Sequence, residues 1–149
     1  MNRTTRRALP LAAAAAALAL TTLTVAPAQA APVGLAVSIT AHTDFTVAAS
    51  AFDSNLPGCV TGTVVNGASR TQFTPWGGLF LGTKSFTCAG GTSGFDISLN
   101  ARFGGGGSTG TWVVANAWGD LAGMKGSGSL VGIPISDTML DDVYTGTVR

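Results

Sequence analysis

Side chains able to do acid–base chemistry are few in this chain, which has one histidine, seven aspartates and no glutamate. His42 is followed two residues later by Asp44, so in an extended segment both side chains would lie on one face. A carboxylate that orients an imidazole begins an acid–base pair or a metal site. Because no third ligand or nucleophile can be assigned, we favour a solvated pair at the turn joining two strands. Asp141 and Asp142 lack the spaced loop of a calcium site and are interpreted as a polar turn before the last strand.

A lysine in an alternating segment is the most informative polar residue. Alternation places Lys84 on one face with Phe80, Phe86 and Cys88. Among aromatic side chains, a lysine either extends to the rim of the fold or anchors a polar group inside a cavity. We favour the rim, because an unpaired ammonium group is costly to bury.

A second alternating segment adds two tryptophans to the predicted interior. Trp112, Val114, Asn116 and Trp118 share a face, and an inward Asn116 would need hydrogen-bond partners, of which a ligand could be one. Plain core packing is the alternative for the tryptophans. No catalytic residue, metal ligand or cofactor is predicted. The predicted ligand-binding residues are Phe80, Lys84, Phe86, Trp112, Val114 and Asn116.

The glycine-rich segment matches the residue pattern of one catalytic and one nucleotide-binding motif but lacks the structural context of both. Residues 106–110 read Gly-x-Ser-x-Gly, but a hydrolase needs that serine on a strand-to-helix turn with a histidine in reach. Residues 105–110 read Gly-x-Gly-x-x-Gly, and no helix follows to hold a pyrophosphate. We expect Gly104 to Gly107 to form a mobile loop tip, and the glycines up to Gly110 to hold no strand.

The first thirty residues have the three parts of a secretory signal: a basic start, an apolar stretch at 11–25, and the small residues Ala28-Gln29-Ala30. The alternative, a membrane anchor, would need about 20 apolar residues, and this run is interrupted by threonines. We therefore expect a signal peptide at 1–30, cleavage near Ala30, secretion, and no stable membrane anchor in the mature protein. An arginine pair at 6–7 leaves the export route open.

Charge and cysteine content limit what the mature chain can do. Cleavage would remove three of the eight basic residues and none of the acidic ones. The five that remain are scattered along the chain, which argues against nucleic acid as a partner. Cys59 and Cys88 are the only cysteines, and in an oxidising compartment we expect them to form a disulfide. Two buried free thiols are the alternative.

The elements that must position these residues are short strands. Runs of alternating residues are separated by Gly, Pro, Asn or Asp, and about eight or nine strands fit into residues 31–149. A single all-β domain results, most simply an antiparallel barrel of about eight strands. A turn at 119–123 could place Leu121 and Met124 as a plug at one end of the core. The expected strands are 35–40, 45–51, 59–65, 71–76, 79–88, 95–103, 111–118, 127–135 and 143–149.

Part of the chain resembles a bacterial family. A Trp-bearing strand at 109–114, followed by Gly-Asp-Leu-Ala-Gly-Met-Lys-Gly-Ser-Gly at 119–128, is similar to exported proteins with an allene oxide cyclase-like, calycin-type barrel. Segments 81–88, 95–102 and 142–146 extend the resemblance, which spans Cys59 to Arg149. It implies an eight-stranded barrel, shared in outline with allene oxide cyclases and dirigent proteins, around an elongated apolar cavity. It implies no reaction, because no catalytic motif of those enzymes matches.

Three functions follow from these observations. The first, which we favour, is a non-enzymatic barrel that binds a small apolar or amphipathic molecule in an internal cavity. The second is a cyclase-like or stereo-directing enzyme, which would need a buried ionisable residue in that cavity. The third is a structural or surface-interaction protein with a filled barrel. The ligand and the oligomeric state are left open.

Overall fold

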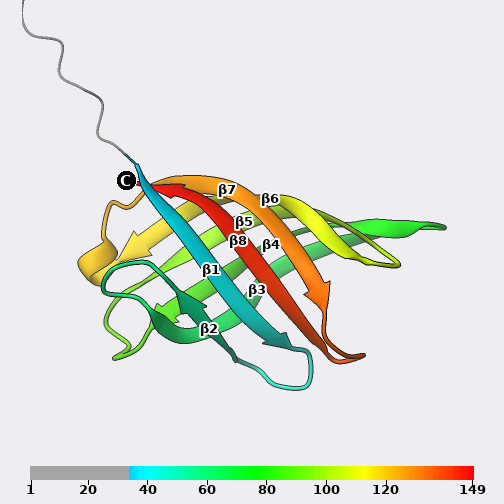
Figure 1. Ribbon diagram of the computed structural model, residues 1–149, viewed down its shortest axis with the longest axis horizontal. Helices are drawn as coiled ribbons and strands as arrows, with labels where there is room; N and C mark the ends of the chain where they lie inside the picture. Colours follow the sequence, from blue (N-terminus) through cyan, green and yellow to red (C-terminus); the bar gives the residue numbers. More distant parts are fainter. Residues whose placement is uncertain (1–33) are drawn as a thin grey trace, which may run out of the picture. The chain divides into compact units, whose positions relative to one another are not determined.

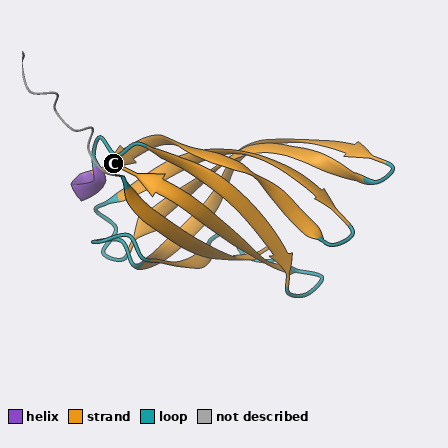
Figure 2. Ribbon diagram, turned by 45° about the horizontal axis from the view of Figure 1, so that its top comes forward, coloured by secondary structure: helices purple, strands orange, loops and turns teal. Residues whose placement is uncertain are grey.

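The computed structural model describes residues 34–149, so the predicted signal peptide at 1–30 lies outside the described residues. Within them, each strand pairs antiparallel with the next and β8 pairs with β1, which closes a barrel (Figures 1 and 2). The predicted all-β barrel is therefore confirmed. No helix among residues 34–149 is long and apolar enough to cross a membrane. The strands are β1 (Leu35–Asp44), β2 (Ser50–Ser54), β3 (Thr61–Thr74), β4 (Gly77–Cys88), β5 (Gly94–Gly104), β6 (Gly107–Trp118), β7 (Gly126–Pro134) and β8 (Met139–Val148), with one 3-10 turn, η1 (Gly119–Leu121).

The barrel has two different ends because the strands run up and down. The loops at 45–49, 75–76, 105–106 and 135–138 lie at one end, which we call the open end. The loops at 55–60, 89–93 and 119–125 lie at the other, which we call the closed end. The β3–β4 hairpin reaches furthest beyond the open end (Figure 1, green). The residues that point inward near each end therefore determine at which end a ligand could enter.

Strand alternation positions the core as expected. In β1, Val37, Ile39, Ala41 and Thr43 are buried, whereas the residues between them are more exposed. Burial of apolar side chains from every strand provides the main driving force for this fold. Leu121 and Met124 also pack against the core, as predicted for a plug.

Three predicted strands, at 45–51, 59–65 and 71–76, are wrong in their bounds. The segment 45–49 is a loop, because the Asp44 carboxylate accepts hydrogen bonds from the N–H and O–H of Thr46 and turns the chain. Only Ser50 and Ala51 of the predicted 45–51 strand belong to β2. The predicted strands 59–65 and 71–76 are parts of one strand, β3, whose register shifts between Asn66 and Ser69. The irregularity lets one long strand bend where the sequence suggests a break.

The glycine-rich segment forms a tight hairpin. The turn takes only residues 105–106, and β6 starts at Gly107, so the prediction that residues 107–110 hold no strand is wrong. A Cβ at Gly110 would collide with the Asn100 carbonyl oxygen of β5. The missing side chain thus allows close pairing of the two backbones, which outweighs the conformational cost of glycine in a strand.

Candidate functional site

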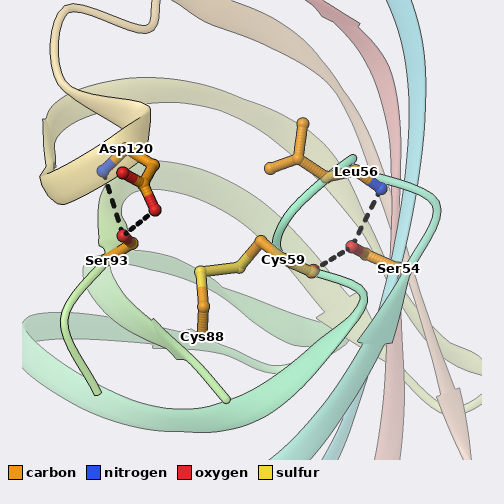
Figure 3. Close-up of a disulfide and its surroundings, with 6 residues drawn as sticks. All are labelled: Ser54, Leu56, Cys59, Cys88, Ser93 and Asp120. Carbon is orange, nitrogen blue, oxygen red and sulfur yellow. Dashed lines mark hydrogen bonds between the residues drawn. A yellow bond between two sulfur atoms is a disulfide. The ribbon is translucent and has the colours of Figure 1, made fainter. Parts of the chain in front are cut away.

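The closed end is filled and covalently tied. Cys59 and Cys88 form the predicted disulfide, both buried, with an S–S bond across 29 residues of sequence (Figure 3). The Ser54 hydroxyl donates to the Cys59 carbonyl at 2.6 Å and accepts the Leu56 N–H at 3.1 Å, which holds the 55–60 loop over the core. Beneath it, Phe86 stacks on another buried aromatic ring, Phe95, with ring centres 4.8 Å apart. Beside this packed core, a second space of about 520 Å³ at the same end is lined by Val114, Lys125 and Val148, among others.

The open end contains a cavity of about 520 Å³. Thr43 of β1 and Lys84 of β4 line it, whereas the next inward residues, Ala41 and Phe86, are buried without lining it. The aromatic core around Phe86 therefore lies beyond this cavity. The cavity walls are mostly apolar, and the large apolar residues that line them are Phe45, Phe73, Phe80, Leu99, Phe103, Leu130 and Leu140.

Three polar side chains form a closed triangle at the bottom of the cavity. The Lys84 ammonium lies 2.6 Å from an Asp142 carboxylate oxygen and donates to the Thr43 hydroxyl at 2.9 Å. The Thr43 hydroxyl donates in turn to the same Asp142 oxygen at 3.0 Å. All three are at most 5% exposed. The ion pair compensates the charge of each partner, which is the condition for burying either one.

Tyr144 completes this group, and we call Thr43, Lys84, Asp142 and Tyr144 the polar cluster. Its ring packs edge-on against Phe86 and Trp112, with centres 5.8 and 6.4 Å away. Tyr144 is among the residues that line the cavity, and its hydroxyl is buried and has no hydrogen-bond partner among the described residues. Burial, with the nearby Asp142 carboxylate, raises the pKa of Tyr144 well above 10, so the phenol stays neutral. The polar cluster thus contains an O–H donor that has no acceptor among the described residues.

Lys84 is inside the barrel, so the prediction that it lies at the rim is wrong. The argument for the rim assumed an unpaired ammonium group, and the structure supplies the partner from a strand 58 residues further along the chain. The prediction of a polar turn at Asp141 and Asp142 is also wrong, because both lie within β8. Asp142 points inward because it alternates with Asp141, which is less buried.

Four of the other predicted ligand-binding residues fall into three groups according to where they lie. Phe80 lines the cavity together with Lys84. Phe86 and Trp112 are buried in the core, and the Trp112 indole N–H donates to the Ser129 and Thr145 carbonyl oxygens at 3.1 and 3.3 Å. Val114 packs against the core without lining the cavity. The structure therefore brings only two of the six residues to the cavity.

Asn116 is exposed, and its predicted inward direction is wrong. In the β5–β6 pairing, Asp96 is opposite Asn116 whereas Ile97 is opposite Val114, so Ala115 is an extra residue. Such a bulge reverses the alternation beyond it. As a result Ala117 packs against the core, and the Asn116 amide approaches Asp96 on the outer face at 3.5 Å. A period-two pattern cannot reveal a bulge of this kind.

His42 lies on the outer face and does not use Asp44 as its partner. Its ring nitrogens lie 2.8 Å from an Asp141 oxygen and 3.2 Å from an Asp53 oxygen, so it links β1 to both neighbouring strands. The hydrogen bond to Asp141 is the main cause that raises the pKa of His42 above its usual 6.5. The predicted solvated pair at a turn is thus wrong, and this histidine is a cross-strand link away from the cavity.

Three members of the polar cluster, Thr43, Asp142 and Tyr144, were not predicted from the sequence as site residues. Asp142 and Tyr144 are two residues apart, so alternation alone places them on one face, and a tyrosine there could have shown that the face is buried. Nothing in the spacing connects them to Lys84. In residues 34–149, no three His, Cys, Asp or Glu side chains lie close enough together to hold a metal ion.

Comparisons with protein-family models, with curated proteins and with solved structures found no match to this chain.

Proposed function

We propose that this protein is a non-enzymatic binder of a small amphipathic molecule, which it holds in the cavity at the open end. The observation that carries the proposal is an apolar space of about 520 Å³ that ends on a buried polar cluster. Ligand sites generally have volumes of about 300 to 1,000 Å³, apolar walls and a few convergent polar groups. Burying the apolar part of a ligand contributes about 25 cal/mol per Å², and the polar cluster would set its orientation.

Export and family membership form part of the same proposal. We propose that the mature protein is secreted after cleavage near Ala30, and a disulfide in its fold supports an oxidising compartment. The allene oxide cyclase-like family is proposed on the segments quoted above, and the closed eight-stranded barrel supports it. An intact mass of protein from culture medium should correspond to a start at or within a few residues of Ala31. A mass that retains residues 1–30 would contradict export by this signal.

A binding titration tests the function. A naphthalene-based fluorescent dye, competed with ten-carbon amphipathic compounds, should bind saturably below about 100 μM, which corresponds to roughly 5.5 kcal/mol. Ala101→Phe should abolish this binding, because Ala101 lines the cavity and the added ring would fill it. The matched control is Ala51→Phe, which adds the same ring on the exposed outer side of β2. No saturable binding to the wild-type protein, or equal loss in both variants, would contradict the proposal.

A second candidate function has one specific observation in its favour. A cyclase-like or stereo-directing enzyme would need an ionisable group buried in the cavity, and Lys84 and Asp142 are such groups. A neutral Tyr144 hydroxyl could polarise a substrate oxygen beside them. Incubation with unsaturated epoxides and analysis by chiral chromatography separates the two functions. Unchanged recovery of a bound compound supports binding, whereas enantiomerically enriched product lost in Tyr144→Phe supports catalysis.

A further inference from the structure

The polar cluster also points to the chemical class of the ligand. We propose that the cavity selects molecules with a neutral oxygen acceptor, a carbonyl or hydroxyl group, on an apolar body, and rejects carboxylates of the same length. This inference rests on the proposed function, because it specifies which amphipathic molecules the cavity would hold. It requires a donor that lacks a partner, a local charge that disfavours an anion, and apolar walls for the rest of the ligand.

The Tyr144 hydroxyl is the donor without a partner. Tyr144 is 1% exposed and is one of the residues that line the cavity, and its hydroxyl makes no hydrogen bond with any described residue. Buried polar groups in folded proteins nearly always have partners, so an exception at a cavity surface is a place where a ligand atom would fit. Because the phenol is neutral, it donates its proton to an acceptor. The ligand atom that suits it is therefore an oxygen with a free lone pair.

The Lys84 ammonium adds a second donor to the same surface. An ammonium group has three N–H donors. Asp142 and Thr43 accept from Lys84, and no third acceptor lies within hydrogen-bond distance of it among the described residues. One N–H is thus left for a ligand or for water. A carbonyl oxygen has two lone pairs and can accept from more than one donor.

The charge of the cluster favours a neutral ligand over an anion. The oppositely charged residues that line the cavity are Lys84 and Asp142, and they form an ion pair at 2.6 Å. A ligand carboxylate would introduce a second negative charge next to Asp142 without a second cation. In an enclosed site this uncompensated charge is costly. A ketone or an alcohol can use the donors without changing the charge.

The walls accommodate the apolar body of such a ligand. Phe80, Leu99 and Phe103 come from the neighbouring strands β4 and β5, and Leu130 and Leu140 from β7 and β8. They leave apolar surface on opposite sides of the cavity. A chain or ring system that extends from the polar cluster would therefore contact carbon atoms rather than charged groups.

Equilibrium competition against the fluorescent dye tests the preference at pH 8, where decanoate is ionised. Wild-type protein should bind 2-decanone and 1-decanol at least about tenfold more tightly than decanoate, a difference of about 1.4 kcal/mol. Tyr144→Phe removes one oxygen atom and keeps the ring, and should weaken ketone binding about tenfold, also about 1.4 kcal/mol, while leaving decanoate almost unchanged. Thr145→Val is the matched control, since it removes a hydroxyl from the exposed outer side of the same strand.

A second variant reverses the selectivity. Asp142→Asn removes the negative charge and leaves the Lys84 ammonium without its counterion, so decanoate should become the preferred ligand. Circular dichroism checks that each variant is folded, and Tyr144→Phe decides the outcome if Asp142→Asn does not fold. Equal affinities for ketone and decanoate, or ketone binding unaffected by Tyr144→Phe, would overturn the inference. In that case dye binding abolished by Ala101→Phe would still support the proposed function, whereas absence of dye binding to wild-type protein would contradict both.

Discussion

The two ends of this barrel differ in how their interiors are filled, although the same strands form both ends. At the closed end, a disulfide and a hydrogen-bonded loop (Figure 3) lie over stacked aromatic rings in the interior. At the open end, the interior is a cavity, and the hairpin and loop tips around it expose large apolar side chains. Phe73 and Trp76 on the β3–β4 hairpin are 80% and 91% exposed. We therefore expect changes at the closed end to act mainly on stability, and changes at the open end to act mainly on the proposed ligand binding.

The comparison shows that burial has different consequences at the two ends. Phe86 and Phe95 are buried against other rings, and their burial lowers the free energy of folding. Lys84 and Asp142 are buried equally well, yet a buried ion pair often contributes little net stability. A buried pair of this kind at the bottom of a cavity is consistent with the proposed role of orienting a ligand. Changes at each end should separate stability from binding.

Breaking the ion pair should give the largest effect. Lys84→Met leaves the Asp142 carboxylate buried with Thr43 as its only donor among residues 34–149, and should lower the free energy of unfolding by about 3 to 5 kcal/mol. Urea unfolding of the mature protein measures this change. The double variant Lys84→Met with Asp142→Leu should recover most of the loss, because no unpaired charge remains. A double variant as unstable as the single one would show that the pair itself stabilises the fold.

Removing the disulfide should have the next largest effect and leave binding intact. Cys59→Ala with Cys88→Ala should lower the free energy of unfolding by about 3 to 4 kcal/mol, since the bridge closes a loop of about 30 residues. Dye affinity should stay within about twofold, because neither cysteine lines the cavity. Thiol titration of the unfolded, unreduced wild-type protein should find no free thiol. Affinity that falls with stability would show that the two ends are coupled.

The glycine hairpin at the open end provides a matched pair of substitutions. Gly107 has a φ of 122°, and a Cβ there would collide with the Gly132 carbonyl oxygen, so Gly107→Ala should cost about 2 kcal/mol. Gly105→Ala is the control, because a Cβ at Gly105 meets no atom within 4 Å and should change stability by less than about 0.5 kcal/mol. Thermal unfolding measures both. Equal tolerance would show that the backbone at the open end rearranges freely.

The smallest expected effect is the pH dependence due to His42. Its pKa is raised in the folded protein, so its stabilising contribution is full below pH 6.5 and is lost as pH rises through the folded value. The ring is 39% exposed, so its ion pairs should contribute less than about 1 kcal/mol. Unfolding measured between pH 5.5 and about 8.5 should show a slope that His42→Gln flattens. An unchanged slope would assign the dependence to another group.

Alternation and cysteine pairing made much of this fold predictable. The clear period-two pattern at 95–103 became β5, and the two cysteines of the sequence became a buried disulfide. The strand was inferred from the local spacing of apolar residues. The disulfide was inferred from a cysteine count that allows only one pairing. The prediction that residues 107–110 form a loop is wrong, because pairing with a neighbouring strand outweighs the conformational cost of glycine in a strand.

The sequence by itself determined that the chain forms strands, that its cysteines have only each other as disulfide partners, and that Lys84 shares a face with aromatic residues. These properties follow from backbone sterics and from the two-residue period of a strand. Only the tertiary structure decided that Lys84 is buried, because its partner Asp142 reaches it through barrel closure across 58 residues. It also decided that Asn116 points outward, because a bulge depends on the pairing of two strands. Contacts between distant segments set both outcomes, and no local pattern contains them.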